Sequence, residues 1–184
     1  DVFARYDIAA VLMTEKEGES SAATAYATAA RNEDAQLVYA RRGQEFALGA
    51  SSTMRVLFPD TNPSDMENNK TSIVLQIQYG DIEFMLTGDS PKSIEEYLVL
   101  LEGAHLESEV LKVGHHGSRT STSELFLDEV QPQFAIISAS ADNSYGHPHI
   151  EVMDMLFDKR VKTLSTAKEG SITFYSDGKE VWVE

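Results

Sequence analysis

The sequence contains no cysteine among its 184 residues. This absence excludes disulfides, iron–sulfur clusters and thiolate zinc sites, because each of these needs sulfur ligands. Any metal ion bound by the protein must therefore be held by His, Asp, Glu or water. The redox compartment stays undecided, since a chain without thiols is compatible with any of them.

Basic residues are also scarce, with 15 Lys and Arg against 30 Asp and Glu, which gives a net charge of −15. Such a field repels phosphate backbones at long range and argues against passive coating of nucleic acid. A nuclease with this charge would need cations to offset the repulsion. The simplest interpretation of the acidic excess is a well-solvated surface.

Long apolar runs are missing as well. No stretch of eighteen or more apolar residues occurs, and the first residues lack the basic-then-apolar order of a signal peptide. The sequence therefore predicts a soluble chain without membrane contact of its own. With 42% hydrophobic residues, the chain is long enough for one core, and we expect residues 1–184 to form a single domain.

Hairpin signals dominate the first half of the sequence, and strands alternate with helices in the second half. The expected strands cover 8–14, 36–39, 45–49, 54–58, 72–79, 82–87, 109–113, 134–138, 161–164, 172–175 and 181–183. The expected helices cover 20–32, 91–103, 122–130 and 150–158, with Ile94, Leu98 and Leu101 on one face of the second. The polar stretch 60–70 is expected to be a loop. This order predicts an α/β (α+β) fold with functional groups at the carboxyl ends of strands.

Candidate ligands follow three of these strands. Asp89 follows the strand at 82–87, His115 and His116 follow the strand at 109–113, and residues 143–149 follow the strand at 134–138. A carboxylate and imidazoles converging at one rim are ligands for zinc, manganese or iron, and a carboxylate can bridge two such ions. His105 stands alone at a helix end, where a surface imidazole is expected.

Four segments, in this order, resemble the metallo-β-lactamase-like domain of the ComEC competence family: Asn68-Asn-Lys-Thr-Ser72, Leu86-Thr-Gly-Asp89, Leu111-Lys-Val-Gly-His-His-Gly-Ser118 and Asn143-Ser-Tyr-Gly-His-Pro148. The resemblance spans nearly the whole chain, and its last two segments are the most specific. One departure lies at residues 165–170, where the family usually has a Thr-Asp pair before the glycine. Here the chain reads Thr166-Ala-Lys-Glu-Gly170, which removes one carboxylate.

The resemblance implies an αβ/βα sandwich that binds two divalent ions, Zn or Mn, with a hydroxide attacking a phosphodiester, for which single-stranded DNA is the expected substrate. Asp89 would be the bridging, catalytic carboxylate. His115 is the first choice for the imidazole ligand of the second metal, with His116 or catalytic His147 as alternatives. The groups expected to hold phosphate oxygens or orient water are Asn69, Ser118, Asn143 and His147. For Ser118 and Asn143, turn formation is the alternative role.

The superfamily holds its first metal with a His-x-His-x-Asp-His motif, and no such string occurs in this sequence. Residues 1–6 and the strand at 8–14 match the segment directly after that motif in relatives. We therefore expect an incomplete sandwich, cut at its N-terminus just beyond the motif. Because three or four ligands would be missing, such a chain is expected to bind metal weakly or not at all and to turn over no substrate.

The sequence supports three hypotheses about function. In the first, the parent protein is a bacterial phosphodiesterase or nuclease linked to DNA uptake, extracytoplasmic or membrane-associated, with an attached membrane domain. In the second, it is a hydrolase of small esters, lactones or phosphorylcholine-type substrates, which fits the acidity better. In the third, the domain is a non-catalytic remnant in which Asp89 and the histidines are relics.

Overall fold

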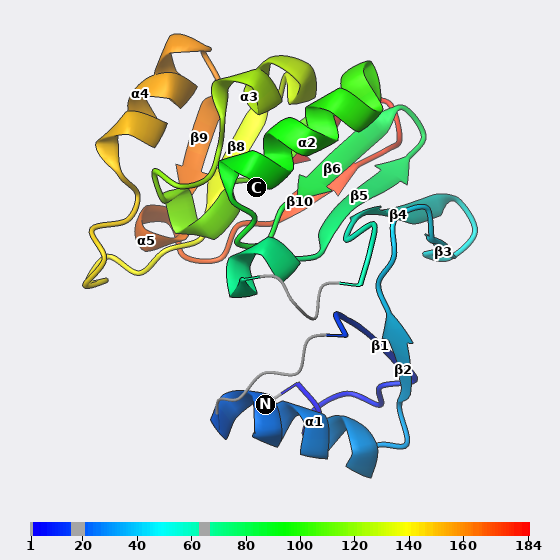
Figure 1. Ribbon diagram of the computed structural model, residues 1–184. Helices are drawn as coiled ribbons and strands as arrows, with labels where there is room; N and C mark the ends of the chain where they lie inside the picture. Colours follow the sequence, from blue (N-terminus) through cyan, green and yellow to red (C-terminus); the bar gives the residue numbers. More distant parts are fainter. Residues whose placement is uncertain (1, 16–20, 63–66) are drawn as a thin grey trace.

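The computed structural model describes residues 2–15, 21–62 and 67–184 (Figure 1). Its elements are β1 (Ala10–Met13), α1 (Ser21–Asn32), β2 (Gln36–Tyr39), β3 (Glu45–Ala47), β4 (Ser52–Phe58), η1 (Asn68–Thr71), β5 (Val74–Tyr79), β6 (Ile82–Leu86), α2 (Lys92–Glu102), η2 (Gly103–Leu106), β7 (Val110–Lys112), η3 (Gly114–Gly117), α3 (Glu124–Val130), β8 (Phe134–Ile137), α4 (Ile150–Asp158), β9 (Lys162–Ser165), α5 (Thr166–Glu169), β10 (Phe174–Ser176) and β11 (Val181–Val183). Each predicted strand and helix is present. Ser20 and residues 63–66 of the predicted loop lie outside the described residues, and residues 68–70 of that loop belong to the 3-10 helix η1.

Strands β3 to β9 form a seven-stranded mixed sheet in sequence order. The strands from β3 to β6 pair antiparallel, and those from β6 to β9 pair parallel. Parallel neighbours need crossover connections, and helices α2, α3 and α4 supply them in turn. The predicted change from hairpins to strand–helix alternation therefore corresponds to the change from antiparallel to parallel pairing.

The hydrophobic core lies between this sheet and its helices, which cover one face in Figure 1. Met85 and Leu111 of the sheet pack in one cluster with Leu98 of α2 and Phe126 of α3. Burial of each such side chain contributes about 1.5–3 kcal/mol. One prediction for α2 is wrong in part, because Leu101 is 41% exposed while the helix buries a carboxylate, Glu95, beside Leu98.

The opposite face of the sheet carries the alternate residues of the same strands. Ile77 and Phe84 are cross-strand partners there, and both are half-buried. The antiparallel hairpin β10–β11 covers part of this face, since the Phe174 ring lies 6.3 Å from Phe84 and 5.3 Å from Phe134. Both faces of the central strands are thus apolar, as expected for strands in a layered α/β fold.

Strands β1 and β2 form a separate two-stranded parallel sheet, connected by α1. In Figure 1 this unit, coloured blue, lies apart from the seven-stranded sheet. The chain rejoins the main sheet where the Arg42 N–H donates to the Pro59 carbonyl at 2.6 Å and Gly43 donates to Val56 at 2.9 Å. Among the described residues, no helix is long and apolar enough to cross a membrane.

Candidate metal centre

Three loops meet where the parallel strands β6, β7 and β8 end. The His115 N–H donates to the Gly88 carbonyl at 3.0 Å, which ties the loop after β7 to the loop after β6. The His149 N–H donates to the Gly117 carbonyl at 2.9 Å, which ties the loop after β8 to the loop after β7. The carboxyl ends of these strands therefore present one hydrogen-bonded rim, the usual position of sites in α/β folds.

The rim brings together the four candidate ligands. The Nε2 atom of His116 lies 4.0 Å from Oδ1 of Asp89, whose side chain is 45% exposed. The ring centroids of His115 and His116 are 6.2 Å apart, and that of His147 lies 5.6 Å from His115 and 6.3 Å from His116. Three separate loops thus deliver one carboxylate and three imidazoles to a single place, as the strand order predicted.

His116 has a fixed orientation. Its Nδ1 atom lies 2.5 Å from the carbonyl oxygen of Ser138. Because a carbonyl can only accept, Nδ1 carries the proton, and the lone pair of the neutral ring is on Nε2, toward Asp89. Metal-binding histidines commonly donate their other ring N–H to a carbonyl or carboxylate in this way. By contrast, Nδ1 of His115 lies 3.5 Å from Nδ2 of Asn69. The geometry therefore favours His116, one of the two alternatives to His115 from the sequence, as the partner of Asp89.

The backbone is strained in the histidine loop, which is the segment Gly114–Gly117 (η3). His115 has φ 47° and His116 has φ 57°, so two consecutive non-glycine residues adopt the left-handed conformation. Each such residue costs about 1–2 kcal/mol relative to the right-handed region. Strain of this kind persists only where the surroundings impose it, and it clusters at functional sites.

The donors fit one side of a metal site. A carboxylate and an imidazole lone pair that face each other are suitable ligands for a divalent transition metal. Within residues 2–15, 21–62 and 67–184, however, no group of three or more His, Cys, Asp or Glu is placed to hold a metal ion. His147, at the same rim, is also a suitable nitrogen donor. Partial burial, and then the neighbouring His149, His115 and His116, hold the pKa of His147 below its ordinary value. It is therefore neutral at pH 7.

The residues expected to bind substrate are placed at or beneath this rim. Asn69 is exposed beside His115, whereas Ser118 is buried, with its Oγ 3.0 Å from Oγ1 of Thr120. Asn143 donates to the carbonyls of Ser140 and His147, both at 2.7 Å, and accepts from the His147 N–H at 2.9 Å. Both N–H groups of the Asn143 amide are thus used in holding its own loop. Binding of substrate by these residues stays a prediction.

Replacing Asn143 with Ala is expected to loosen the loop at 140–147, because three hydrogen bonds are lost. The cost in free energy of unfolding should be only about 1 kcal/mol, since water replaces the lost partners in an exposed loop. The informative measurement is the backbone ¹⁵N order parameter of residues 141–146, which should fall. Asn143→Asp keeps the acceptor for His147 and should show a smaller change. Unchanged order parameters in both variants would contradict this role.

A buried carboxylate supports the histidine loop from below. Glu95 on α2 is 1% exposed, and its two oxygens accept the backbone N–H groups of Thr122 at 2.8 Å and Ser123 at 2.7 Å. A Cβ added at Gly114 would lie 3.4 Å from Oε1 of Glu95, so the carboxylate abuts the residue before His115. Burial raises the pKa of Glu95 to about 7. Sequence patterns did not reveal this residue, because one Glu in an amphipathic helix normally faces water.

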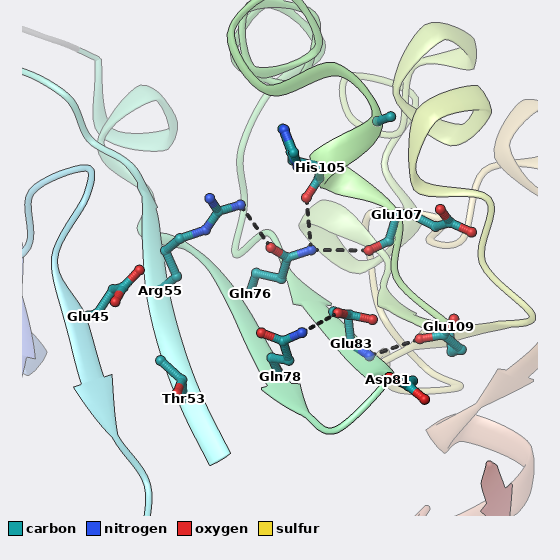
Figure 2. A pocket seen from close by; sticks show the side chains of 11 residues that line it. Glu45, Thr53, Arg55, Gln76, Gln78, Asp81, Glu83, His105, Glu107 and Glu109 are labelled. Carbon is teal, nitrogen blue, oxygen red and sulfur yellow. Dashed lines mark hydrogen bonds between the residues drawn. The ribbon is translucent and has the colours of Figure 1, made fainter. Parts of the chain in front are cut away.

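A separate group of carboxylates lies around another cavity. This cavity has a volume of about 540 Å³ and is lined by Glu45, Asp81, Glu83, Glu107 and Glu109 together with Arg55 and His105. Figure 2 shows these side chains. Burial and the neighbouring Glu109 raise the pKa of Glu83 there. His105 is the one histidine that lines this cavity, so the acidic cavity and the candidate metal centre are different places. His105 is exposed, so the prediction of a surface imidazole at this position is confirmed.

No family model matches the chain. It is 36% identical over 146 residues to ComE operon protein 3 of Bacillus subtilis, covering 79% of the chain and 18% of that protein. It is 38% identical over 120 residues to competence protein ComA of Neisseria gonorrhoeae, covering 64% of the chain and 17% of that protein. The chain is homologous to the ComEC competence family. This ComEC homologue thus spans less than one fifth of the length of these relatives.

The fold of the ComEC homologue is similar to that of a solved enzyme. CmlA, a diiron β-hydroxylase from Streptomyces venezuelae, superposes with a TM-score of 0.53 at 13% identity, covering 84% of this chain and 38% of that chain. Similarity at this identity shows the fold alone, which is metallo-β-lactamase-like. The family and the mixed α/β fold predicted from the sequence motifs are therefore confirmed.

Proposed function

We propose that this chain supplies the second-metal half of a phosphodiesterase or nuclease centre in a ComEC-type protein that acts in DNA uptake. The observation that carries this proposal is the approach of Nε2 of His116 to Oδ1 of Asp89 at 4.0 Å, with the ring of His116 oriented by the Ser138 carbonyl. Asp89 is the proposed bridging carboxylate. His116 is the proposed imidazole ligand, with His115 and His147 adjacent.

Two comparisons support this function. The relative from Neisseria gonorrhoeae is described as a competence protein, and CmlA, which shares the fold, is described as a diiron β-hydroxylase. When bound, a pair of divalent ions supplies Lewis-acid charge and lowers the pKa of water. Those cations would also offset the repulsion between phosphate and a chain of net charge −15, because they would present positive potential where a phosphate must approach.

The chain's own residues have separate tasks in this proposal. Asp89 and His116 supply donors, and the carbonyl of Ser138 keeps the ring of His116 from rotating. His147 is neutral at pH 7, and its backbone is held by Asn143; its proposed task is to orient water or a phosphate oxygen beside these donors. Two donors hold an ion weakly, so we propose that the His-x-His-x-Asp-His motif of the superfamily completes the centre, and that this chain alone binds metal weakly and turns over no substrate.

Replacing Asp89 with Asn should lower the activity of a ComEC-type protein that carries both this site and the His-x-His-x-Asp-His motif. We expect activity to fall by more than about 100-fold. Removing a residue that only hydrogen-bonds to a metal ligand already lowers metal affinity or activity by about 10–100-fold. Activity would be measured with manganese or zinc on single-stranded DNA and on bis(p-nitrophenyl) phosphate. Asp81→Asn, in the acidic cavity, is the matched control and should leave activity unchanged.

The outcomes of this assay separate the hypotheses. Cleavage of DNA that depends on Asp89 supports a nuclease. Cleavage of the small ester without cleavage of DNA replaces the nuclease with a small-ester hydrolase of the same fold. If neither substrate is cleaved, and Asp89→Asn leaves the metal content unchanged, the site assignment fails and a non-catalytic domain is the better description.

A further inference from the structure

A second cavity opens directly beside the candidate metal centre. Its volume is about 460 Å³, and it shares His116 and His147 with that centre. Its remaining walls are small residues at 138–140, Asn143, Tyr145 and Thr166. No carboxylate is among the described residues that line it, although the chain has 30 acidic residues. The cavity therefore suits an uncharged group attached to whatever binds at the metal centre.

Flat rings form one side of this cavity. Tyr145 is 77% exposed, and its ring stacks on His147 with a centroid distance of 5.7 Å and an interplanar angle of 20°. His147 in turn stacks near His116, at 6.3 Å and 25°. Nearly parallel rings thus continue from the partner of Asp89 out to an exposed aromatic face. Such a face binds other flat rings well, because stacking buries area without requiring matched hydrogen bonds.

The cavity is held in shape before any ligand binds. Asn143 holds the backbone on either side of Tyr145 through Ser140 and His147. Oγ1 of Thr166 accepts from the Ala139 N–H and donates to the Ala139 carbonyl, both at 3.1 Å. Thr166 belongs to the segment where the sequence departs from the family pattern. Walls fixed in this way lose little conformational entropy on binding.

We propose that Tyr145 and this cavity bind a nucleobase of the substrate by stacking, next to the phosphodiester held at the metal centre. The inference rests on the proposed function, because it assigns the cavity to the same substrate. Charge supports it, since a chain of net charge −15 cannot hold nucleic acid through its phosphates alone. Stacking on aromatic rings is insensitive to charge and tolerates every base. The cavity volume is also within the range of small-molecule sites.

The test measures binding of a dinucleotide containing 2-aminopurine to this chain, by quenching of its fluorescence, without metal. Tyr145→Ala should weaken binding about tenfold or more, the loss usual for one stacked base. Tyr145→Trp should retain wild-type affinity. The matched control is Tyr175→Ala, which removes a tyrosine that is 44% exposed and stacks on Trp182 in the β10–β11 hairpin. This control should bind like the wild type.

Three results would overturn the inference. They are the absence of dinucleotide binding at millimolar concentration, equal affinity of Tyr145→Ala and the wild type, and equal binding of a dinucleotide whose base at the tested position has been removed. Because binding is measured without turnover, it is independent of the cleavage assay. If only the proposed hydrolysis fails, the dinucleotide binds in a base-dependent way but no substrate is cleaved. If only the base site fails, substrate is cleaved and dinucleotide binding does not depend on Tyr145.

Discussion

Replacing Glu95 with Ala should lower the free energy of unfolding by about 3–5 kcal/mol. The change removes both acceptors from the buried N–H groups of Thr122 and Ser123, and each unsatisfied buried donor costs about 1–3 kcal/mol. The vacated volume beside Gly114 adds a cavity cost. Because this position supports the segment between the histidine loop and α3, the amide resonances of residues 114–123 should shift more than those of the antiparallel strands.

The same residue gives wild-type stability a recognisable pH dependence. The pKa of Glu95 is about 7 in the folded state against an ordinary value of 4.5, so between these values the folded state binds a proton that the unfolded state has lost. The contribution of Glu95 to stability is therefore complete below pH 4.5 and is lost as pH rises to about 7, by about 3 kcal/mol in total. Glu95→Gln cannot titrate and should remove this loss.

Denaturant unfolding at pH 5 and pH 8 checks this expectation, with the stability difference between wild type and Glu95→Gln as the quantity compared. The difference should shift by about 3 kcal/mol between the two pH values, in favour of the wild type at pH 5. Glu96→Gln, on the exposed side of the same helix, is the control and should give a constant difference. A constant difference for Glu95→Gln as well would show that this carboxyl does not titrate as described.

Replacing Gly117 with Ala should lower the free energy of unfolding by about 2–4 kcal/mol and displace the rim. Gly117 has φ +82°, which costs a side-chain-bearing residue about 1–2 kcal/mol. The new Cβ would also lie 2.6 Å from Cβ of Pro148, an overlap whose relief costs about 1–3 kcal/mol. Relief requires the histidine loop and the loop carrying His147 to move apart, so the ring contact between His115 and His147 should be lost.

Gly146 offers a matched control for this variant, since it has φ +71° but no atom within 4 Å of an added Cβ. Gly146→Ala should therefore show the backbone cost alone, about 1–2 kcal/mol. The nuclear Overhauser contact between the rings of His115 and His147 should survive in Gly146→Ala and vanish in Gly117→Ala. Equal stability losses in the two variants would mean that close packing on Pro148 does not hold the rim together.

Sequence patterns predicted the positions of the elements and the edge at which the site lies. Hairpin signals marked the strand pair at 72–79 and 82–87, which the structure places at Val74–Tyr79 and Ile82–Leu86, and the later segments were predicted to alternate between strand and helix. Parallel strands end at one edge, so Asp89, His115 and His147 had to meet there. This part of the site follows from topology and needs no side-chain detail.

The remaining features depend on conformation that a single sequence does not encode locally. The geometry that favours His116 over His115 depends on two left-handed backbone angles and on the carbonyl of Ser138, which directly follows another strand, β8. The burial of Glu95 depends on a backbone N–H donor, that of Thr122, 27 residues away in the chain. The stacking of Tyr145 on His147 depends on how Asn143 folds their loop.

Titration of this chain with Mn²⁺ tests the central claim most directly, with paramagnetic broadening of the histidine ring signals in ¹H–¹⁵N spectra as the readout. We expect the rings of His116, His115 and His147 to broaden first, and Asp89→Asn to abolish that preference. His105, in the acidic cavity, should broaden only at higher Mn²⁺ concentration. Earlier broadening of His105, or an unchanged pattern in Asp89→Asn, would contradict a metal centre built on Asp89 and His116.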